Sequence, residues 1–226
     1  IDREVLAIRK KLLGDEHPDV AFSLNSLAVV MGEQGDYAEA EALHREALAM
    51  QKKLYGKEHP NVAAFLYCWA ETVQSRGDYA EAEAMLREAL AMDRKLHGEE
   101  HPEVATTLIK LAEISKVQFQ YAEAETICRE GLAMRESFLG GEHPDVAGAL
   151  GALASILEAQ KKYRAALPLA QRALWIAGKQ LPVMNPDIAG IIDTLAEIHM
   201  GLGEEEKARV YEGCAKAIRG EGEESG

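Results

Sequence analysis

Apolar residues follow helical spacing twice within each repeating stretch of this chain. The first stripe has the spacing i, i+4, i+7, i+8 and i+11, and it consists of Val20, Leu24, Leu27, Ala28 and Met31. The second stripe consists of Tyr37, Ala40, Leu43, Ala47, Leu48 and Met50. Because such spacing keeps apolar side chains on one face of a helix, the pattern predicts a helix over 18–34 and a second over 37–54.

Two short phrases repeat with the same period. His-Pro pairs begin at positions 17, 59, 101 and 143, so successive pairs share one constant spacing, and Asn185-Pro186 keeps the proline one period later. A Tyr-Ala-Glu-Ala-Glu phrase begins at Tyr37, returns at Tyr79 and Tyr121, and decays to Tyr163-Arg164-Ala165-Ala166. A fixed period of this length is typical of stacked structural repeats. We therefore expect function on the surface that the array builds.

The residues at the predicted helix ends agree with this division. Pro18 suits a first helical turn, where its missing N–H would have no partner in any case. Gly35 can adopt the left-handed backbone that ends the first helix, Asp36 can cap the second, and Gly56 can end it. Phe119 stands at the position of Gly35 in its own repeat. A left-handed turn there would strain the phenylalanine by about 1 kcal/mol or somewhat more.

The period divides residues 1–219 into a single repeat array followed by a polar tail over 220–226, which we expect to be disordered. The predicted units are a half repeat at 1–13 and full repeats near 18–56, 60–98, 102–140, 144–181 and 186–219. In the last repeat Glu205 replaces tyrosine and Lys216 replaces leucine, changes that suit a terminal helix with no neighbour to cover it. The chain begins inside a repeat phrase without a methionine, so we expect a fragment of a longer protein.

The order of these residues resembles the tetratricopeptide repeat, in which small alanine positions let two antiparallel helices pack closely. The residues that carry the resemblance are Leu24, Leu27-Ala28, Gly35, Tyr37, Ala40 and Ala47. The usual unit of that family is shorter, at about 34 residues. The His-Pro-x-Val-Ala opening and the 42-residue period resemble instead the variant found in kinesin light chain and in bacterial light-chain-like proteins. The resemblance implies an all-α fold, a right-handed superhelical solenoid of antiparallel helix pairs.

Composition narrows the range of partners. The formal net charge is −13, which argues against a nucleic-acid partner because such binding needs clustered lysine and arginine. No apolar run approaches the roughly 18 residues that a membrane span requires, so we expect no membrane partner. The three cysteines, Cys68, Cys128 and Cys214, show no CxxC spacing. A sparse, odd set indicates reduced thiols and a cytoplasmic protein.

The Glu-His pairs before each proline raise the question of a metal site. Zinc needs ligands within about 2 Å of one point, whereas equivalent residues of stacked repeats are roughly 10 Å or more apart. We therefore expect each histidine to order its link between repeats by hydrogen bonding or packing, with no metal and no cofactor. The enzyme alternative is Cys68 or Cys128 acting as a nucleophile with a distant histidine. No catalytic motif supports it, and buried structural cysteines are the commoner case, so we predict no enzyme.

In tetratricopeptide arrays the exposed face of the first helices lines a concave groove that holds an extended peptide. Counting about 100° per residue from the buried stripe, and carrying each position forward by one period, places residues of this chain on that face. The predicted groove residues are Phe22, Asn25, Val29, Glu33, Tyr67, Glu71, Gln74, Ile109, Glu113, Lys116, Gly151, Ser155, Glu158, Asp193 and Glu197, with Gly32 and Ser75 beside them. Six of the groove residues are acidic and only Lys116 is basic. This balance predicts a basic or amide-rich partner.

Two questions stay open from the sequence. Gly148, Gly151 and Gly190 on the same face indicate either close packing or room for a bulky side chain of the ligand. The function that we predict is a non-catalytic protein-interaction scaffold. The alternatives are a peptide-sensing regulatory segment of a larger multidomain signalling protein, and a self-associating structural spacer. The basic groove with which kinesin light chain reads acidic cargo is not reproduced in these residues.

Overall fold

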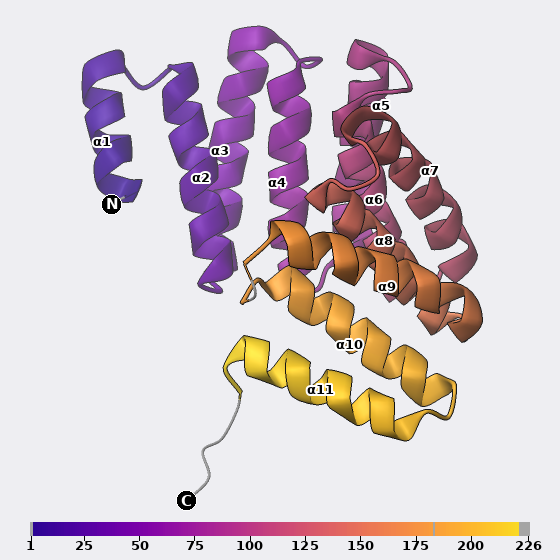
Figure 1. The fold of residues 1–226 in the computed structure, drawn as a ribbon. Coiled ribbons are helices and arrows are strands. Elements are labelled where there is room, and N and C mark those ends of the chain that lie inside the picture. The colour runs from indigo at the N-terminus through magenta and orange to yellow at the C-terminus, as the bar shows by residue number, and fades with distance from the viewer. Residues whose placement is uncertain (1, 183, 222–226) are drawn as a thin grey trace, which may run out of the picture. The chain divides into compact units, whose positions relative to one another are not determined.

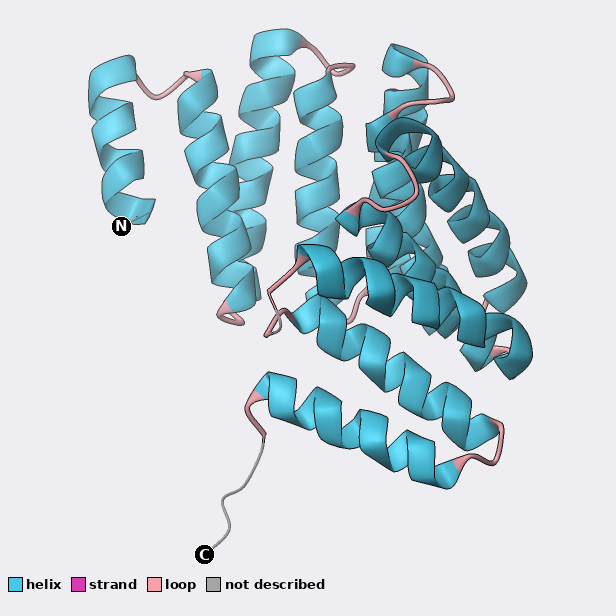
Figure 2. Cartoon of the chain, in the orientation of Figure 1, coloured by secondary structure: helices cyan, strands magenta, loops and turns pink. Residues whose placement is uncertain are grey.

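The computed structural model describes residues 2–182 and 184–221, and these residues form eleven α-helices and no strand (Figure 1 and Figure 2). The helices are α1 Asp2–Leu13, α2 Pro18–Glu33, α3 Tyr37–Tyr55, α4 Pro60–Arg76, α5 Tyr79–His97, α6 Pro102–Val117, α7 Tyr121–Leu139, α8 Pro144–Ala159, α9 Tyr163–Gln180, α10 Pro186–Gly201 and α11 Glu205–Arg219. The predicted all-α class is confirmed, and the helix ends lie within one residue of those predicted for α2 and α3. Of the expected tail, 222–226 lie outside the described residues, as do Ile1 and Val183.

The first helix of each repeat begins at a proline, and the residue before that proline caps the helix. These first helices are α2, α4, α6, α8 and α10. The Nδ1 atoms of His17 and His59 accept hydrogen bonds from the backbone N–H two residues later, at 3.1 and 3.2 Å. His101 and His143 make the same bond at 3.3 and 3.1 Å. In the last repeat the Oδ1 of Asn185 accepts the equivalent bond at 2.7 Å. The expectation that the histidines order the links is confirmed, because each satisfies an N–H group that the helix leaves without a partner.

The turn inside each repeat reverses the chain through a residue with left-handed backbone. Gly35 has φ 83°, and the same position is held by Phe119 with φ 64° and Lys161 with φ 61°. The turn is closed by bonds from Phe119 N to Lys116 O at 3.0 Å and from Gln120 N to Ser115 O at 2.9 Å. Phe119 therefore has the left-handed conformation under which strain is expected, because a side chain is unfavourable there.

The core forms where the two apolar stripes of a repeat face each other. The five residues of the first stripe are all buried, as are the small positions Ala40 and Ala47 of the second. Leu27, Met31 and Ala40 form a cluster that Leu6 of α1 also contacts. The alanines leave room for the two helices to approach, which explains why small residues recur at these places.

The contacts between residues divide the chain into two compact units, Ile1–Ile114 and Ser115–Gly226, with the boundary inside α6. In the first unit α2 packs on α3 and α4 packs on α5; in the second, α8 packs on α9 and α10 packs on α11. First helices of successive repeats also touch within each unit, α2 with α4 and α8 with α10. A first helix is therefore covered on two sides, by its own partner and by the next first helix.

Two of the turn tyrosines, Tyr37 and Tyr163, reach the end of the next first helix. The hydroxyl of Tyr37 donates to the carbonyl of Ser75 at 3.0 Å. In the second unit the ring of Tyr163 lies against Gly201, where an added Cβ would come within 2.3 Å of the ring. Successive repeats inside a unit are thus held together at their turns as well as through the helix faces.

Candidate functional site

A hollow of about 250 Å³ lies on the first unit between the C-terminal halves of α2 and α4. Its lining residues are Val29, Gly32, Glu33, Cys68, Glu71, Thr72, Gln74, Ser75 and Lys110. Gly32 allows the two helices to approach, because an added Cβ would lie 2.9 Å from Cγ2 of Thr72. Four of the predicted groove residues, Val29, Glu33, Glu71 and Gln74, therefore surround one depression.

Lys110 of α6 changes the charge of this hollow. Its Nζ lies 3.2 Å from Glu71 and 3.4 Å from Glu113. Burial works to lower the pKa of Lys110, but the carboxylates of Glu113 and Glu71 outweigh it, and the pKa is raised. Both glutamates belong to the predicted groove and Lys110 does not, so the prediction treats both carboxylates as available to a ligand. In the structure the two carboxylates are already bridged by an internal cation.

Two polar groups of the hollow remain without such partners. Glu33 is exposed at the end of α2, and no ion pair to it is found within 2–182 and 184–221. The Oε1 atom of Gln74 is buried and has no hydrogen-bond partner in that same part of the chain. A buried acceptor without a partner is unfavourable by about 1–3 kcal/mol. An exposed carboxylate and a buried amide oxygen without a partner among the described residues therefore belong to residues that line the same hollow.

A buried polar network reaches this hollow through Thr72. The imidazole of His44, on α3, lies 3.0 Å from Oδ1 of Asn25 and 3.0 Å from Oγ1 of Thr72. Its ring also stacks on Trp69 at a centroid distance of 6.0 Å. Burial lowers the pKa of His44 to about 4, so the ring is neutral at pH 7. The network connects α2, α3 and α4 and holds Thr72, a lining residue, in place.

Two residues of the predicted groove lie elsewhere than expected. Asn25 is 8% exposed, and its side chain belongs to the His44 network. Ile109 is 5% exposed, inside the core. The groove positions are predicted on the assumption that each first helix has a single buried face. Neighbouring first helices also pack on one another, so a second face is partly buried as well. Phe22 does remain accessible, and its ring meets Phe65 edge to face at 5.2 Å; Tyr67 is half-buried.

In the second unit the predicted residues make their own contacts. Lys116 donates a hydrogen bond to Ser155, and Asp193 forms an ion pair with Arg219. The pKa of Glu158 is raised, first by burial and then by the charge of Glu197, while Lys116 works in the opposite direction. Glu158 and Glu197 therefore form a pair of like charges that a cation would relieve.

The glycines of the second unit have different surroundings. A Cβ on Gly151 would lie 3.1 Å from Cγ1 of Ile191, so this glycine serves close packing between α8 and α10. A Cβ on Gly190 would meet nothing within 4 Å, and one on Gly148 would come only to 3.9 Å from Arg135. None of these three glycines lines the hollows of about 720, 420 and 250 Å³ found among the described residues. Close packing is the better interpretation of Gly151.

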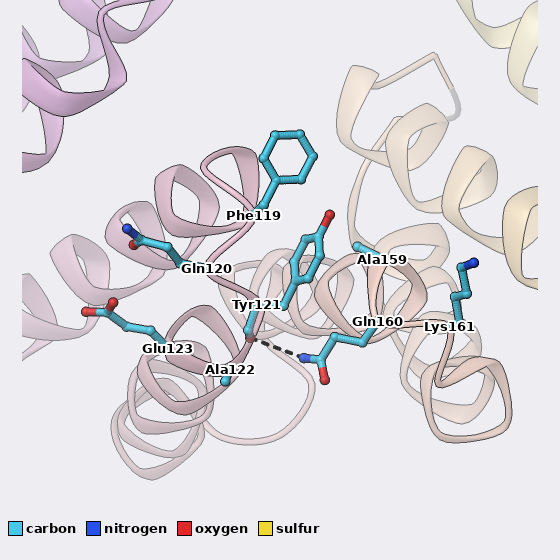
Figure 3. Close-up of a pocket in the computed structure, with 8 residues that line it drawn as sticks. All are labelled: Phe119, Gln120, Tyr121, Ala122, Glu123, Ala159, Gln160 and Lys161. Carbon is cyan, nitrogen blue, oxygen red and sulfur yellow. Dashed lines mark hydrogen bonds between the residues drawn. The ribbon is translucent and has the colours of Figure 1, made fainter.

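A larger hollow, of about 720 Å³, lies at the turns of the second unit (Figure 3). Its lining residues are Phe119, Gln120, Tyr121, Ala122, Glu123, Ala159, Gln160 and Lys161. The Nε2 of Gln160 donates to the carbonyl of Tyr121 at 3.1 Å and to Glu125 at 2.8 Å. The sequence indicates strain at Phe119 but predicts no site there, because the groove that the tetratricopeptide resemblance implies runs along helix faces and not along turns.

The chemistry of the cysteines does not favour a nucleophile. Cys128 is fully buried, and Cys68 is half-buried with a pKa raised chiefly by burial. A raised pKa disfavours the reactive thiolate. Within the described ranges, no group of three or more histidine, cysteine, aspartate or glutamate side chains is arranged to hold a metal ion. In that same part of the chain, no helix combines the length and apolar character needed to cross a membrane.

Comparison with known proteins supports a repeat-protein assignment. Tetratricopeptide repeat models match residues 1–19, 20–61, 61–116 and 111–177. A search of curated protein sequences found no match to the chain. Tetratricopeptide repeats generally act as non-enzymatic scaffolds for protein–protein interaction.

Solved structures share the fold. A putative kinesin light chain from Podosopora anserina with nearly identical TPR-like repeats has 25% sequence identity and a TM-score of 0.71, over 92% of this chain and 99% of that one. BtubC (BKLC) from P. vanneervenii has 23% identity and a TM-score of 0.78, over 100% of this chain and 90% of that one. Aspartyl phosphate phosphatase F from Bacillus subtilis has 18% identity and a TM-score of 0.72, over 96% and 55%. With repeat models covering most of its length, the chain belongs to the tetratricopeptide repeat family.

Proposed function

We propose that the chain is a non-catalytic scaffold that binds an extended, basic or amide-rich segment of a partner protein along its first helices. Membership of a family whose repeats generally mediate protein–protein interaction supports the scaffold role. The sparse cysteines of the sequence favour a reducing compartment, so the proposal includes a cytoplasmic location. The lining of the hollow between α2 and α4 supports the proposed chemistry of the ligand.

The observation that carries this proposal is the buried Oε1 of Gln74 on the wall of a hollow that also presents Glu33. An amide or ammonium N–H of the ligand would satisfy the acceptor, and its positive charge would pair with the carboxylate. Glu71 and Glu113 contribute less than their charges imply, because Lys110 already bridges them. Val29 and the exposed part of Phe22 offer apolar contact on the same helix.

The pair formed by Glu158 and Glu197 is the corresponding feature of the second unit. A lysine or arginine of the ligand placed between the two carboxylates would remove their mutual repulsion, so binding gains a charge contact that exists in neither partner alone. Asp193 is not assigned to the ligand because Arg219 pairs with it. Each unit thus has one acidic contact point for a basic segment.

The test compares short fluorescent peptides rich in lysine and glutamine with charge-reversed peptides in which glutamate replaces lysine. The basic peptide is expected to bind more tightly and to weaken as salt is added. Glu33→Ser places at that position the residue that the next repeat has at Ser75. This variant should bind the basic peptide about three- to fivefold more weakly, in line with the loss of one exposed ion pair.

A matched control is Glu212→Ser on α11, which removes the same charge from an exposed position outside the hollow. It should leave affinity within about twofold of the unmodified chain, since separate surface charges are screened. Unchanged binding of the basic peptide by Glu33→Ser would show that the hollow is only a solvated surface.

A further inference from the structure

Two turns of the second unit contain a residue that the backbone disfavours. Phe119 and Lys161 have left-handed φ values of 64° and 61°, where the other turns have Gly35, Gly77 and Gly203. The fold gains little from the phenylalanine, because its side chain is 78% exposed and its ring meets that of Tyr121 edge to face at a centroid distance of 6.1 Å. When packing of the side chain does not offset a strained backbone conformation, the strain indicates a function of the side chain itself.

Both strained residues line the same hollow of about 720 Å³. Figure 3 shows the ring of Tyr121 between Phe119 and Ala159, while the carboxylate of Glu123 points away from these rings. Lys161 also lines a second hollow of about 420 Å³, formed with Lys162, Tyr163, Arg164, Ala165 and Leu202. The two adjoining depressions thus combine an exposed aromatic surface with a group of basic residues, and Lys161 is common to both.

The basic residues in these hollows are not all neutralised by the protein. Lys162 pairs with Glu125 at 2.9 Å. That carboxylate also receives hydrogen bonds from Gln160 and Arg129, and with Lys162 as the largest influence its pKa is lowered to about 2. The carboxylate of Glu125 therefore already accepts hydrogen bonds from three side chains. No ion pair to Lys161 or to Arg164 is found in the part of the chain that the structure describes, so two cations face solvent beside the aromatic surface.

The turns of the first unit have the opposite charge. Where the second unit has Lys162, Arg164 and Ala165, the first repeat has Asp36, Ala38 and Glu39, and the next repeat keeps the same three residue types. The change from acidic to basic occurs in a chain whose net charge is −13. A concentration of unpaired positive charge on such a background selects a partner of opposite charge.

We propose that this turn surface, formed by Phe119, Tyr121, Lys161, Arg164 and Leu202, binds an acidic segment of a partner protein that carries an apolar side chain. The apolar side chain packs on Phe119 and Tyr121, and the flanking carboxylates pair with Lys161 and Arg164. The surface lies on the turns, and its charge is opposite to that of the hollow between α2 and α4. It is therefore a second binding surface that does not depend on the proposed groove.

The test uses the whole 226-residue chain and a fluorescent peptide of glutamate and serine with two central leucines. Fluorescence anisotropy is expected to show binding that weakens with salt, and the bound peptide should be displaced by its unlabelled copy but not by the same peptide with lysine in place of glutamate. Three substitutions, Phe119→Gly, Lys161→Gly and Arg164→Ala, each introduce a residue that the first repeat has at the equivalent position. Each should weaken binding about three- to tenfold, the range of a lost exposed pair or contact.

Thermal unfolding separates this role from a structural one. Phe119→Gly and Lys161→Gly relieve the left-handed strain, so both variants should melt at the same temperature as the unmodified chain or higher while they lose affinity. Lys216→Ala on α11 is the matched loss of an exposed charge and should bind the acidic peptide unchanged. Glu33→Ser, which tests the other hollow, should also leave this binding unchanged.

Several results would overturn the proposal. One is the absence of binding at about millimolar peptide, since a dissociation constant of that size corresponds to a binding free energy of roughly −4 kcal/mol. Another is unchanged affinity in the variant that combines all three substitutions. A third is a preference of the surface for single-stranded nucleic acid or anionic vesicles over the acidic peptide, which would assign it to a different class of partner.

Discussion

The histidine caps allow a prediction whose size can be worked out from the structure. His59 accepts a hydrogen bond from the backbone N–H of Asn61 at 3.2 Å, and its ring stacks on Tyr55 at a centroid distance of 4.4 Å. Loss of a side-chain cap destabilises by about 1 kcal/mol, and loss of an aromatic pair by about 0.5–1.5 kcal/mol. His59→Ala should therefore lower the free energy of unfolding by about 2 kcal/mol.

His59→Asn separates the two contributions. Asn185 makes the same cap in the last repeat at 2.7 Å, so asparagine at position 59 should keep the hydrogen bond and lose only the stacking on Tyr55, a loss of about 1 kcal/mol. At His143, for which no stacked ring is found among the described residues, alanine should destabilise by about 1 kcal/mol and asparagine by close to none.

The measurement is urea unfolding followed by far-UV circular dichroism, with the dependence on urea compared between variants. For a chain of this size 1 kcal/mol corresponds to about 2–4 °C in the melting temperature. The reasoning fails if His59→Asn is as destabilising as His59→Ala, or if alanine leaves stability unchanged at both positions. Either result would mean that the hydrogen bond from the backbone does not hold the link.

Three further predictions concern burial and packing. Burial, followed by the charge of Glu103, raises the pKa of Asp93 to about 6 from the ordinary value of 3.8, so the folded state binds the proton more tightly than the unfolded chain. Asp93 therefore favours folding below about pH 4, and this contribution is lost as the pH rises to about 6. Asp93→Asn should be more stable than the unmodified chain by a difference that grows across this range and is constant by about pH 7, which urea unfolding at several pH values can measure. Gly201→Ala should destabilise by about 1–3 kcal/mol in thermal unfolding because its Cβ would meet the ring of Tyr163 at 2.3 Å, whereas Gly190→Ala, with nothing within 4 Å, should be neutral or stabilising. Hydrogen exchange should show Leu6 and Ile8 of α1 less protected than Leu108 and Leu111, since terminal elements of a repeat array open first; equal protection would contradict this.

Much of the fold could be predicted because each signal occurs several times. The prolines, the cap positions and the buried stripe recur with one period, so an accidental pattern in one repeat is outweighed by the others. The predicted stripe from Val20 to Met31 is buried throughout. Even the role of the histidines followed from their place before a proline, although the choice between hydrogen bonding and packing needed the structure.

The site was less predictable because its properties depend on residues that do not repeat. His44 occupies a position where the next three repeats have Leu86, Cys128 and Ala170, and a polar residue at a core position was the available signal for the buried network. Lys110 was missed because it lies outside the positions counted for the groove, although its side chain reaches Glu71. Helical projection treats one helix at a time, whereas burial of Asn25 arises from contacts among three helices.

The histidine cap joins one repeat to the next through atoms that all lie within two residues of each other. The cap therefore has the same local structure whichever two repeats it connects. Removal of residues 60–101 would place His59 directly before Pro102 and Glu103, and the new junction would again have a ring nitrogen two residues before a backbone N–H. The length of the array can therefore change by whole periods without a new kind of junction, so that duplication or loss of a repeat alters how much surface is presented and leaves the local connection intact.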